Sequence, residues 1–144
     1  MTGLVPFLTF QPGKGQSAAE AIEFYTSLFS DGVIVSESRY GPEGPGPEGS
    51  VQVAEFVTAG HRIRCSDSFV DHEWDFTPAV SLWLEFDQRE ELQRIFDALA
   101  DGGKVHMPLD DYGFGPFGWV DDRFAVSWQL VVTGTVNSPA PGTE

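Results

Sequence analysis

Glu85 is the first side chain whose type and position could do chemistry. It stands two residues after Trp83, within the apolar run AVSLWLEF of residues 79–86. If Glu85 is buried beside Trp83, the loss of solvation suits it to act as a general base near neutral pH. Alternatively, Glu85 forms an ion pair with Arg62 or Arg64. The sequence leaves both interpretations open.

The three histidines lie in separate segments and do not have the spacing of a metal site. His61 follows Gly60 at a predicted turn, where we expect it to be exposed. His72 belongs to the acidic segment DSFVDHEWDF, which either raises its pKa through nearby negative charge or is simply a solvated linker. His106 lies between apolar neighbours on a predicted strand, so it either faces a cavity as a catalytic group or is a satisfied interior group.

Aromatic side chains are the other resource for binding. Trp83 and Trp119, with Phe7 and Phe117, could line a site for a hydrophobic or ring-bearing ligand. The alternative is that most of them belong to a core that must be rich in rings, because 12 of the 144 residues are phenylalanine. We expect Trp128 to pack beneath a helix.

The segment GFGPFG, residues 113–118, fits the letters of a dinucleotide-binding loop. Such a loop joins a strand to a helix, whose N-terminus binds the phosphate. Here the segment contains Pro116 and opens into GWVDDRF and a further strand. We therefore interpret it as a glycine-rich connection between strands. Within GWVDDRF, Asp121, Asp122 and Arg123 are predicted to form a turn.

Composition limits the class of protein. The length of 144 residues suits one domain, and the net charge of −14 disfavours nucleic acid and strongly anionic ligands. A single cysteine, Cys65, excludes an intrachain disulfide and fits a reducing compartment. No apolar run is long enough to span a membrane, and the N-terminus does not resemble a signal peptide. We expect a soluble, cytoplasmic protein.

The hydrophobic period changes several times along the chain and predicts a repeated order of elements. A strand, a helix capped by Ser17 and three further strands occupy residues 4–66, and the same β-α-β-β-β order returns over residues 79–132. We therefore predict one domain, residues 1–134, made of two modules. A loop at 41–49 is interpreted as a hairpin connection or mobile flap, and residues 135–144 as a disordered tail. The predicted strands and helices cover 4–10, 18–30, 33–40, 51–58, 61–66, 79–86, 88–100, 104–109, 117–121 and 125–132.

Alternation within the strands assigns their faces. Val80, Leu82, Leu84 and Phe86 should pack beneath the helix of the second module, whereas Ser81, Trp83 and Glu85 should point the other way. The last strand divides in the same manner, which places Gln129 on the face of Glu85. Phe7 and Thr9 form the matching row of the first strand. Residues 33–40 alternate as a half-buried strand should.

Three segments carry a family resemblance: PFLTF at 6–10, AEAIEFYTSLF at 19–29 and GWVDDRFAVSWQLVV at 118–132. They resemble the vicinal oxygen chelate superfamily, which includes glyoxalases, bleomycin-resistance proteins and dioxygenases. Within it they are similar to the branch named for PhnB or for 3-demethylubiquinone-9 3-methyltransferase, except that Ala125 replaces a usual glycine. The resemblance covers residues 4–132. It implies an α+β, glyoxalase-like fold, with each module a cupped, mixed-sheet half-barrel and two modules around one cavity, and it implies a homodimer.

The resemblance also identifies where metal-dependent members hold their ion. The equivalent positions here are Val5, Arg64, Ser81 and Gln129, of which only Gln129 could coordinate. One amide oxygen does not hold a divalent cation, which takes three or four ligands in such sites. We therefore predict no metal and no cofactor, and we expect that the methyltransferase name does not describe the activity.

Two classes of function follow from these observations. The first is a metal-free small-molecule binding protein with a hydrophobic or aromatic ligand. The alternative is an enzyme of the same fold, either a lyase, isomerase or dioxygenase or the methyltransferase of the family name, with Glu85 and His106 as catalytic residues. Nucleic acid and membranes are not expected as partners. The predicted ligand-binding residues are Phe7, Thr9, Ser81, Trp83, Trp119 and Gln129.

Overall fold

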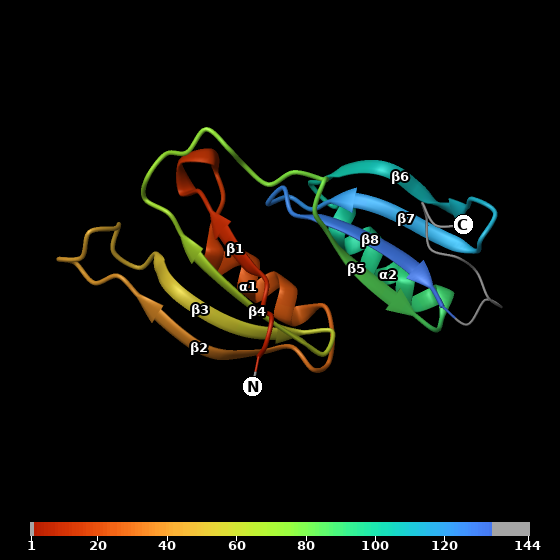
Figure 1. The fold of residues 1–144 in the computed structure, drawn as a ribbon, viewed down its shortest axis with the longest axis horizontal. Coiled ribbons are helices and arrows are strands. Elements are labelled where there is room, and N and C mark those ends of the chain that lie inside the picture. Colours follow the sequence, from red (N-terminus) through yellow and green to blue (C-terminus); the bar gives the residue numbers. More distant parts are fainter. Residues whose placement is uncertain (1, 134–144) are drawn as a thin grey trace. The chain divides into compact units, whose positions relative to one another are not determined.

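A computed structural model describes residues 2–133 (Figure 1). The chain divides into two compact units, Met1–Glu73 and Trp74–Glu144, and each is described by itself. Each unit carries one four-stranded mixed sheet and one α-helix, which confirms the predicted α+β class. The predicted disordered tail, 135–144, lies outside the described residues. Neither helix within 2–133 has the length and apolar character that a membrane crossing requires.

The N-terminal unit has the strand order β1-β4-β3-β2. Strand β1 runs parallel to β4, and the other neighbours are antiparallel. Ser17 caps α1 as predicted, because its Oγ accepts a hydrogen bond from the backbone N–H of Glu20 at 3.3 Å. The hairpin between β3 and β4 turns at Ala59 and Gly60, where φ is positive at both residues. The elements are β1 (Phe7–Phe10), the 3₁₀ turn η1 (Pro12–Lys14), α1 (Ala18–Ser27), β2 (Val33–Arg39), β3 (Val51–Thr58) and β4 (His61–Asp67).

The C-terminal unit repeats this arrangement. Its strand order is β5-β8-β7-β6, again with the first strand parallel to the last. The repeat of element order that the sequence predicted is therefore confirmed. The elements are β5 (Ser81–Phe86), α2 (Arg89–Ala100), β6 (Lys104–Asp111), β7 (Pro116–Asp121) and β8 (Ser127–Val132).

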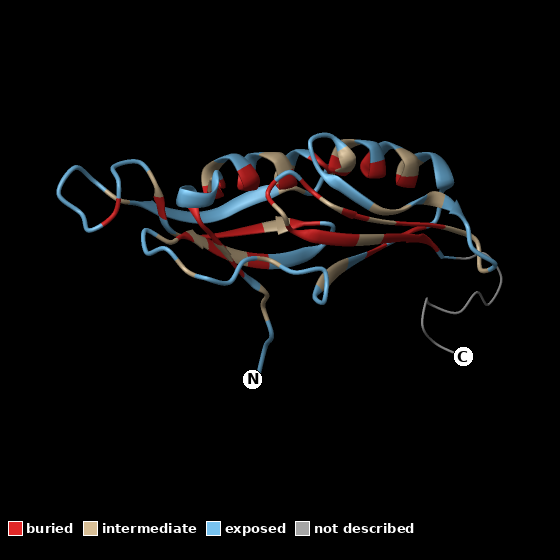
Figure 2. Ribbon diagram, turned by 90° about the horizontal axis from the view of Figure 1, so that it is seen from above, coloured by how far each residue is buried: buried red, intermediate tan, exposed pale blue. Residues whose placement is uncertain are grey.

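In each unit the helix covers one face of its sheet, and the buried side of the helix faces the strands (Figure 2). The predicted row of β5 is confirmed only in part: Leu84 and Phe86 are buried against α2, whereas Leu82 is half-buried and Val80, which precedes β5, is 73% exposed. Trp128 is also buried on this covered face, opposite Val120. Strand β7 approaches α2 so closely that a Cβ on Gly118 would lie 2.5 Å from the Phe96 ring. Glycine at position 118 is therefore a packing requirement.

Strand β2 differs from the prediction. Its alternating sequence indicated a half-buried strand, but all seven of its residues are exposed. The reason is its place at the edge of the sheet, where it has a single strand neighbour. An apolar run of Val33, Ile34 and Val35 is consequently left in contact with solvent.

The turn between β7 and β8 is organised by one buried carboxylate. Asp122 is 3% exposed, and its side chain accepts hydrogen bonds from the backbone N–H groups of Phe124 and Val126 and from Trp128 Nε1, at 2.8, 3.1 and 2.9 Å. The predicted turn at 121–123 is confirmed, and it forces Ala125 to a φ of 75°. That conformation favours glycine, which explains why a glycine is usual at this position.

We predict that Ala125→Gly stabilises the protein. The change relieves a left-handed conformation that costs a residue with a Cβ about 1–2 kcal/mol, and this gain exceeds the extra entropy of glycine in the unfolded chain. The free energy of unfolding, measured by urea titration, should rise by about 0.5–1 kcal/mol. A fall in stability would show that the strain at position 125 is absent.

Candidate functional site

The face of the C-terminal sheet that points away from α2 gathers most of the predicted site residues, and we call it the aromatic face. Strand register places Trp83 and Trp119 on either side of Gln129, and Ser81 opposite Ser127. The predicted row of β5 and the predicted position of Gln129 are therefore confirmed. The side chains of the aromatic face are those of Ser81, Trp83, Glu85, His106, Phe117, Trp119, Asp121, Ser127, Gln129 and Val131.

Gln129 lies at the centre of the aromatic face. Its Nε2 donates a hydrogen bond to Ser81 Oγ at 2.7 Å, which fixes the orientation of the amide. Among residues 2–133, nothing donates to the Gln129 amide oxygen. This neutral acceptor is half-buried, so it is placed to receive one hydrogen bond from a ligand.

Rings surround this amide. Trp83 is 38% exposed, and its ring centroid lies 6.2 Å from that of the buried Phe117. Trp119 is half-buried, and its Nε1 donates a hydrogen bond to Ser127 Oγ at 2.8 Å. Tyr112, next to this face, contacts Phe117 edge-on. The aromatic face thus offers ring surfaces that a flat apolar compound can stack on.

His106 and Asp121 are in contact on this face. His106 Nε2 lies 2.9 Å from Asp121 Oδ2, and the imidazole packs on Trp119 with centroids 5.4 Å apart. The two side chains are not oriented for a hydrogen bond. His106 Nε2 and Asp121 Oδ1 are both buried, and neither has a hydrogen-bond partner among residues 2–133. His106 therefore lies half-buried on the aromatic face, and its catalytic role stays a prediction.

Glu85 is not in the environment that the sequence suggested. It is exposed, and its Oε2 accepts a hydrogen bond from Trp83 Nε1 at 3.2 Å. The burial that would suit Glu85 to act as a general base is absent within this unit. Arg62 and Arg64 lie in the other unit, where both bind Glu55, and the alternative ion pair with Glu85 stays a prediction.

The other histidines and the cysteine do not join the aromatic face. His61 is exposed as predicted, and the ring of His72 contacts Ser68 Oγ at 2.9 Å. Cys65 is buried on the covered face of the N-terminal sheet. Burial, with the negative charges of Asp67 and Glu37, raises the pKa of its thiol to about 12. Cys65 is therefore not a nucleophile near neutral pH.

Phe7 and Thr9 lie on the open face of the N-terminal sheet, which belongs to the other unit. Phe7 is 51% exposed and stands opposite Arg64 in the register. On the same face Glu55 binds both guanidinium groups, with Arg62 Nε at 2.7 Å and Arg64 Nη1 at 2.8 Å. The hydrogen bond from Arg62 lowers the pKa of Glu55, against an opposing effect of burial.

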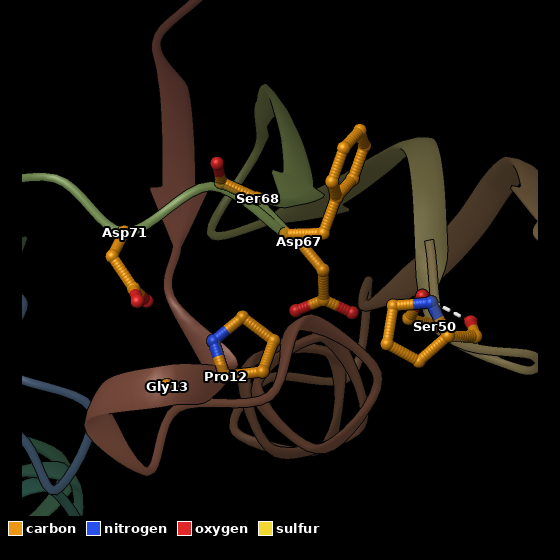
Figure 3. Close-up of a pocket in the computed structure, with 8 residues that line it drawn as sticks. Pro12, Gly13, Ser50, Asp67, Ser68 and Asp71 are labelled. Carbon is orange, nitrogen blue, oxygen red and sulfur yellow. Dashed lines mark hydrogen bonds between the residues drawn. The ribbon is translucent and has the colours of Figure 1, made fainter. Parts of the chain in front are cut away.

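Sequence reasoning missed a hollow in the N-terminal unit (Figure 3). It has a volume of about 180 Å³. The Asp67 carboxylate points into it but is already engaged, since it accepts hydrogen bonds from Ala18 N at 2.8 Å and Val51 N at 2.9 Å. The hollow is formed by three separate segments, among them the glycine- and proline-rich segment 41–49, which contributes Pro47. The lining residues are Pro12, Gly13, Pro47, Ser50, Asp67, Ser68, Phe69 and Asp71.

A metal ion does not fit the positions that the superfamily resemblance singles out. Val5 offers no donor, Arg64 is a cation bound to Glu55, and Ser81 accepts the hydrogen bond of Gln129. Within residues 2–133, no group of three or more His, Cys, Asp or Glu side chains could hold a metal ion.

A nucleoside-containing methyl donor fits equally poorly. The GFGPFG segment joins β6 to β7, and Asp111 Oδ1 accepts hydrogen bonds from Gly113 N and Gly115 N at 2.8 and 3.1 Å. These bonds lower the pKa of Asp111. The N-terminus of α1 already receives the Asp67 carboxylate, so it is not open to an anionic group of a bound donor.

Comparisons with known proteins identify the family. The model of the 3-demethylubiquinone-9 3-methyltransferase family matches residues 2–131, so the chain belongs to this family. A PhnB protein of Bacillus cereus that carries the same methyltransferase name is 44% identical. Its structure superposes with a TM-score of 0.85, over 91% of this chain and 99% of that one.

Two further matches differ in reach. Protein YjdN of Escherichia coli (strain K12) is 32% identical over 87 residues, which is 60% of this chain but only 58% of YjdN. A glyoxalase/bleomycin resistance protein/dioxygenase domain from Frankia is 16% identical, with a TM-score of 0.62 over 92% of this chain and 98% of that one. The fold is thus that of the vicinal oxygen chelate superfamily, as the sequence indicated.

The charge cluster on the N-terminal sheet predicts a specific pH dependence. Because the pKa of Glu55 in the folded protein lies below its ordinary value of 4.5, its stabilising effect is present above that pH and is lost as the pH falls through the lowered pKa. Wild type should therefore exceed Glu55→Gln in stability at neutral pH, and this difference should shrink in acid. A difference that stays constant from about pH 6 to about pH 3 in denaturant titrations would contradict the assignment.

Proposed function

We propose that this member of the 3-demethylubiquinone-9 3-methyltransferase family binds a hydrophobic or aromatic small molecule on its aromatic face, without a metal ion. The observation that supports the proposal is the amide of Gln129, which is oriented by Ser81 and flanked in the register by Trp83 and Trp119. Ring surfaces with a few placed polar groups are typical of small-molecule sites.

The expected affinity for the ligand is modest. Each ring that stacks on Trp83 or Trp119 adds about 0.5–1.5 kcal/mol beyond the apolar area removed from water. A hydrogen bond to the Gln129 amide oxygen adds about 0.5–1.5 kcal/mol and selects a ligand that carries an N–H or O–H group. Neutral groups dominate this part of the sheet, so the recognised end of the ligand is itself neutral.

The chemistry of the donors supports a metal-free site. Ser81 and Gln129 are already bonded to each other, and the carboxylate of Glu85 is bonded to Trp83 Nε1. The family name suggests transfer of a methyl group, but neither the glycine-rich loop nor the N-terminus of α1 is arranged to bind the donor. Binding, rather than methylation, is therefore the function that we propose.

A catalytic function is the second candidate, and the pair His106 and Asp121 is the observation that favours it. The imidazole lies on the aromatic face and contacts a carboxylate at 2.9 Å, an arrangement that suits proton transfer to or from a bound carbonyl compound. Glu85, which is exposed on the same face, is the second proton-transfer group of this candidate. On the binding proposal, His106→Gln leaves ligand affinity unchanged and there is no turnover to lose.

The assembly and location of the protein remain proposals. A homodimer is supported by the exposed apolar run Val33, Ile34 and Val35 on the edge strand β2, because unpaired apolar edges tend to associate. A cytoplasmic location is consistent with the single buried thiol of Cys65.

The binding proposal predicts that Trp83→Ala weakens binding of N-phenyl-1-naphthylamine, a neutral fluorescent aromatic amine. Loss of the exposed ring of Trp83 should raise the dissociation constant about tenfold, which corresponds to about 1.4 kcal/mol. The measurement is a fluorescence titration of the probe with each protein.

Trp74→Ala is the matched control, because Trp74 is also an exposed tryptophan of the C-terminal unit but precedes β5. It should leave the affinity unchanged. Equal affinities for wild type and Trp83→Ala, or a larger loss in Trp74→Ala, would place the binding surface elsewhere.

The metal-free part of the proposal has its own measurement. Protein purified without chelator should contain far less than one equivalent of any transition metal by elemental analysis, because the positions that the resemblance singles out supply one amide oxygen, that of Gln129, and such an ion takes three or four ligands. Near-stoichiometric zinc, nickel or iron would overturn this part of the proposal.

A further inference from the structure

The open face of the N-terminal sheet carries an unusual surplus of positive charge. Arg62 and Arg64 share one carboxylate, Glu55, so that one positive charge is left over in a protein whose net charge is −14. The two guanidinium groups are accessible, with side chains 58% and 40% exposed, whereas the Glu55 side chain is only 10% exposed. The Glu55 carboxylate is thus largely buried, whereas both guanidinium groups are accessible to solvent.

The two arginines bind Glu55 in different ways. Arg62 uses the edge formed by Nε and Nη2, with Nε to Oε2 at 2.7 Å and Nη2 to Oε1 at 3.2 Å. Arg64 uses only Nη1, at 2.8 Å from Oε1. The Nε and Nη2 edge of Arg64, which is the edge that matches a carboxylate, therefore has no acceptor among residues 2–133.

Further groups lie on the same face of the sheet as Arg64, on its own strand and on the neighbouring strand β1. The register pairs Phe7 with Arg64 and Thr9 with Ser66, and alternation places all four side chains on the same open face. The hydroxyls of Thr9 and Ser66 make no hydrogen bond within the described part of the chain. Phe7 is 51% exposed and offers a ring beside the guanidinium. The neighbouring strands β1 and β4 thus carry the free Nε and Nη2 edge of Arg64, the hydroxyls of Thr9 and Ser66, and the ring of Phe7.

We propose that this surface is a binding site for the carboxylate group of a small apolar or aromatic acid. The carboxylate binds the Nε and Nη2 edge of Arg64 in a bidentate manner, Thr9 and Ser66 donate to its outer lone pairs, and its apolar body packs on Phe7. Glu55 keeps Arg62 occupied and holds Arg64 by Nη1, so that the free edge of Arg64 is fixed in orientation. This site lies in the N-terminal unit and does not depend on the function proposed for the aromatic face.

The strong overall negative charge sharpens the selectivity of such a site. A net charge of −14 repels anions in general. An anion therefore binds only if it forms both hydrogen bonds with the Nε and Nη2 edge of Arg64 and also packs an apolar group on Phe7. Inorganic phosphate can bind the Nε and Nη2 edge of Arg64 but has no apolar group to pack on Phe7. Benzamide has the ring of benzoate but carries no charge.

The test is a titration of the isotopically labelled protein with benzoate, phosphate or benzamide, followed by NMR. Benzoate should bind saturably and shift the Arg64 Nε–H signal, whereas phosphate and benzamide should bind at least about tenfold more weakly. Arg64→Gln should weaken benzoate about tenfold or more, and Arg64→Lys, which keeps the charge but loses the fork, should also weaken it. Arg39→Gln is the control, since this guanidinium of the same unit binds Glu37 and lies outside the site.

A second pair of variants keeps the proposal falsifiable if Arg64→Gln fails to fold. Thr9→Val and Ser66→Ala should each weaken benzoate about threefold, because each removes a hydroxyl that donates to the bound carboxylate. Unchanged benzoate affinity in Arg64→Gln and Thr9→Val would overturn the proposal. Equal binding of phosphate or benzamide would also overturn it, because the fork and the ring would then not act together.

Discussion

Each sheet of this protein has one helix, and one helix can cover only one face of a four-stranded sheet. Because side chains alternate along a strand, this constraint divides a strand that lies beneath the helix into a core row and an uncovered row. In β5 the core row is Leu84 and Phe86, and the uncovered row is Ser81, Trp83 and Glu85. The chemistry of the protein lies in the uncovered rows, since the covered rows are engaged in packing.

The two units use the same arrangement for different surfaces. The uncovered face of the C-terminal sheet is built from rings and neutral hydrogen-bonding groups around Gln129. The uncovered face of the N-terminal sheet instead carries Arg62, Arg64 and Glu55. A repeated backbone thus presents one surface that suits neutral aromatic compounds and another that suits a carboxylate, with little residue identity between the two.

Local patterns in the sequence predicted the strands, the helices and their faces well. Alternation placed Gln129 beside Trp83, and the turn at Asp122 followed from its short polar sequence. The errors concern information that is not local. That Glu55 binds both arginines depends on which strands are neighbours, and the exposure of β2 depends on its place at the sheet edge. The hollow beside Asp67 unites three segments far apart in the sequence, so no single window could indicate it.

The central claim is that the uncovered row around Gln129 is a ligand surface and not merely solvent-exposed sheet. The most direct measurement is a map of amide chemical-shift changes when a neutral aromatic compound with an N–H or O–H group is added. The account predicts changes concentrated at Ser81, Trp83, Phe117 and Gln129, together with the side-chain amide of Gln129. Changes confined to α2 and the core row, or no changes at saturating compound, would contradict it.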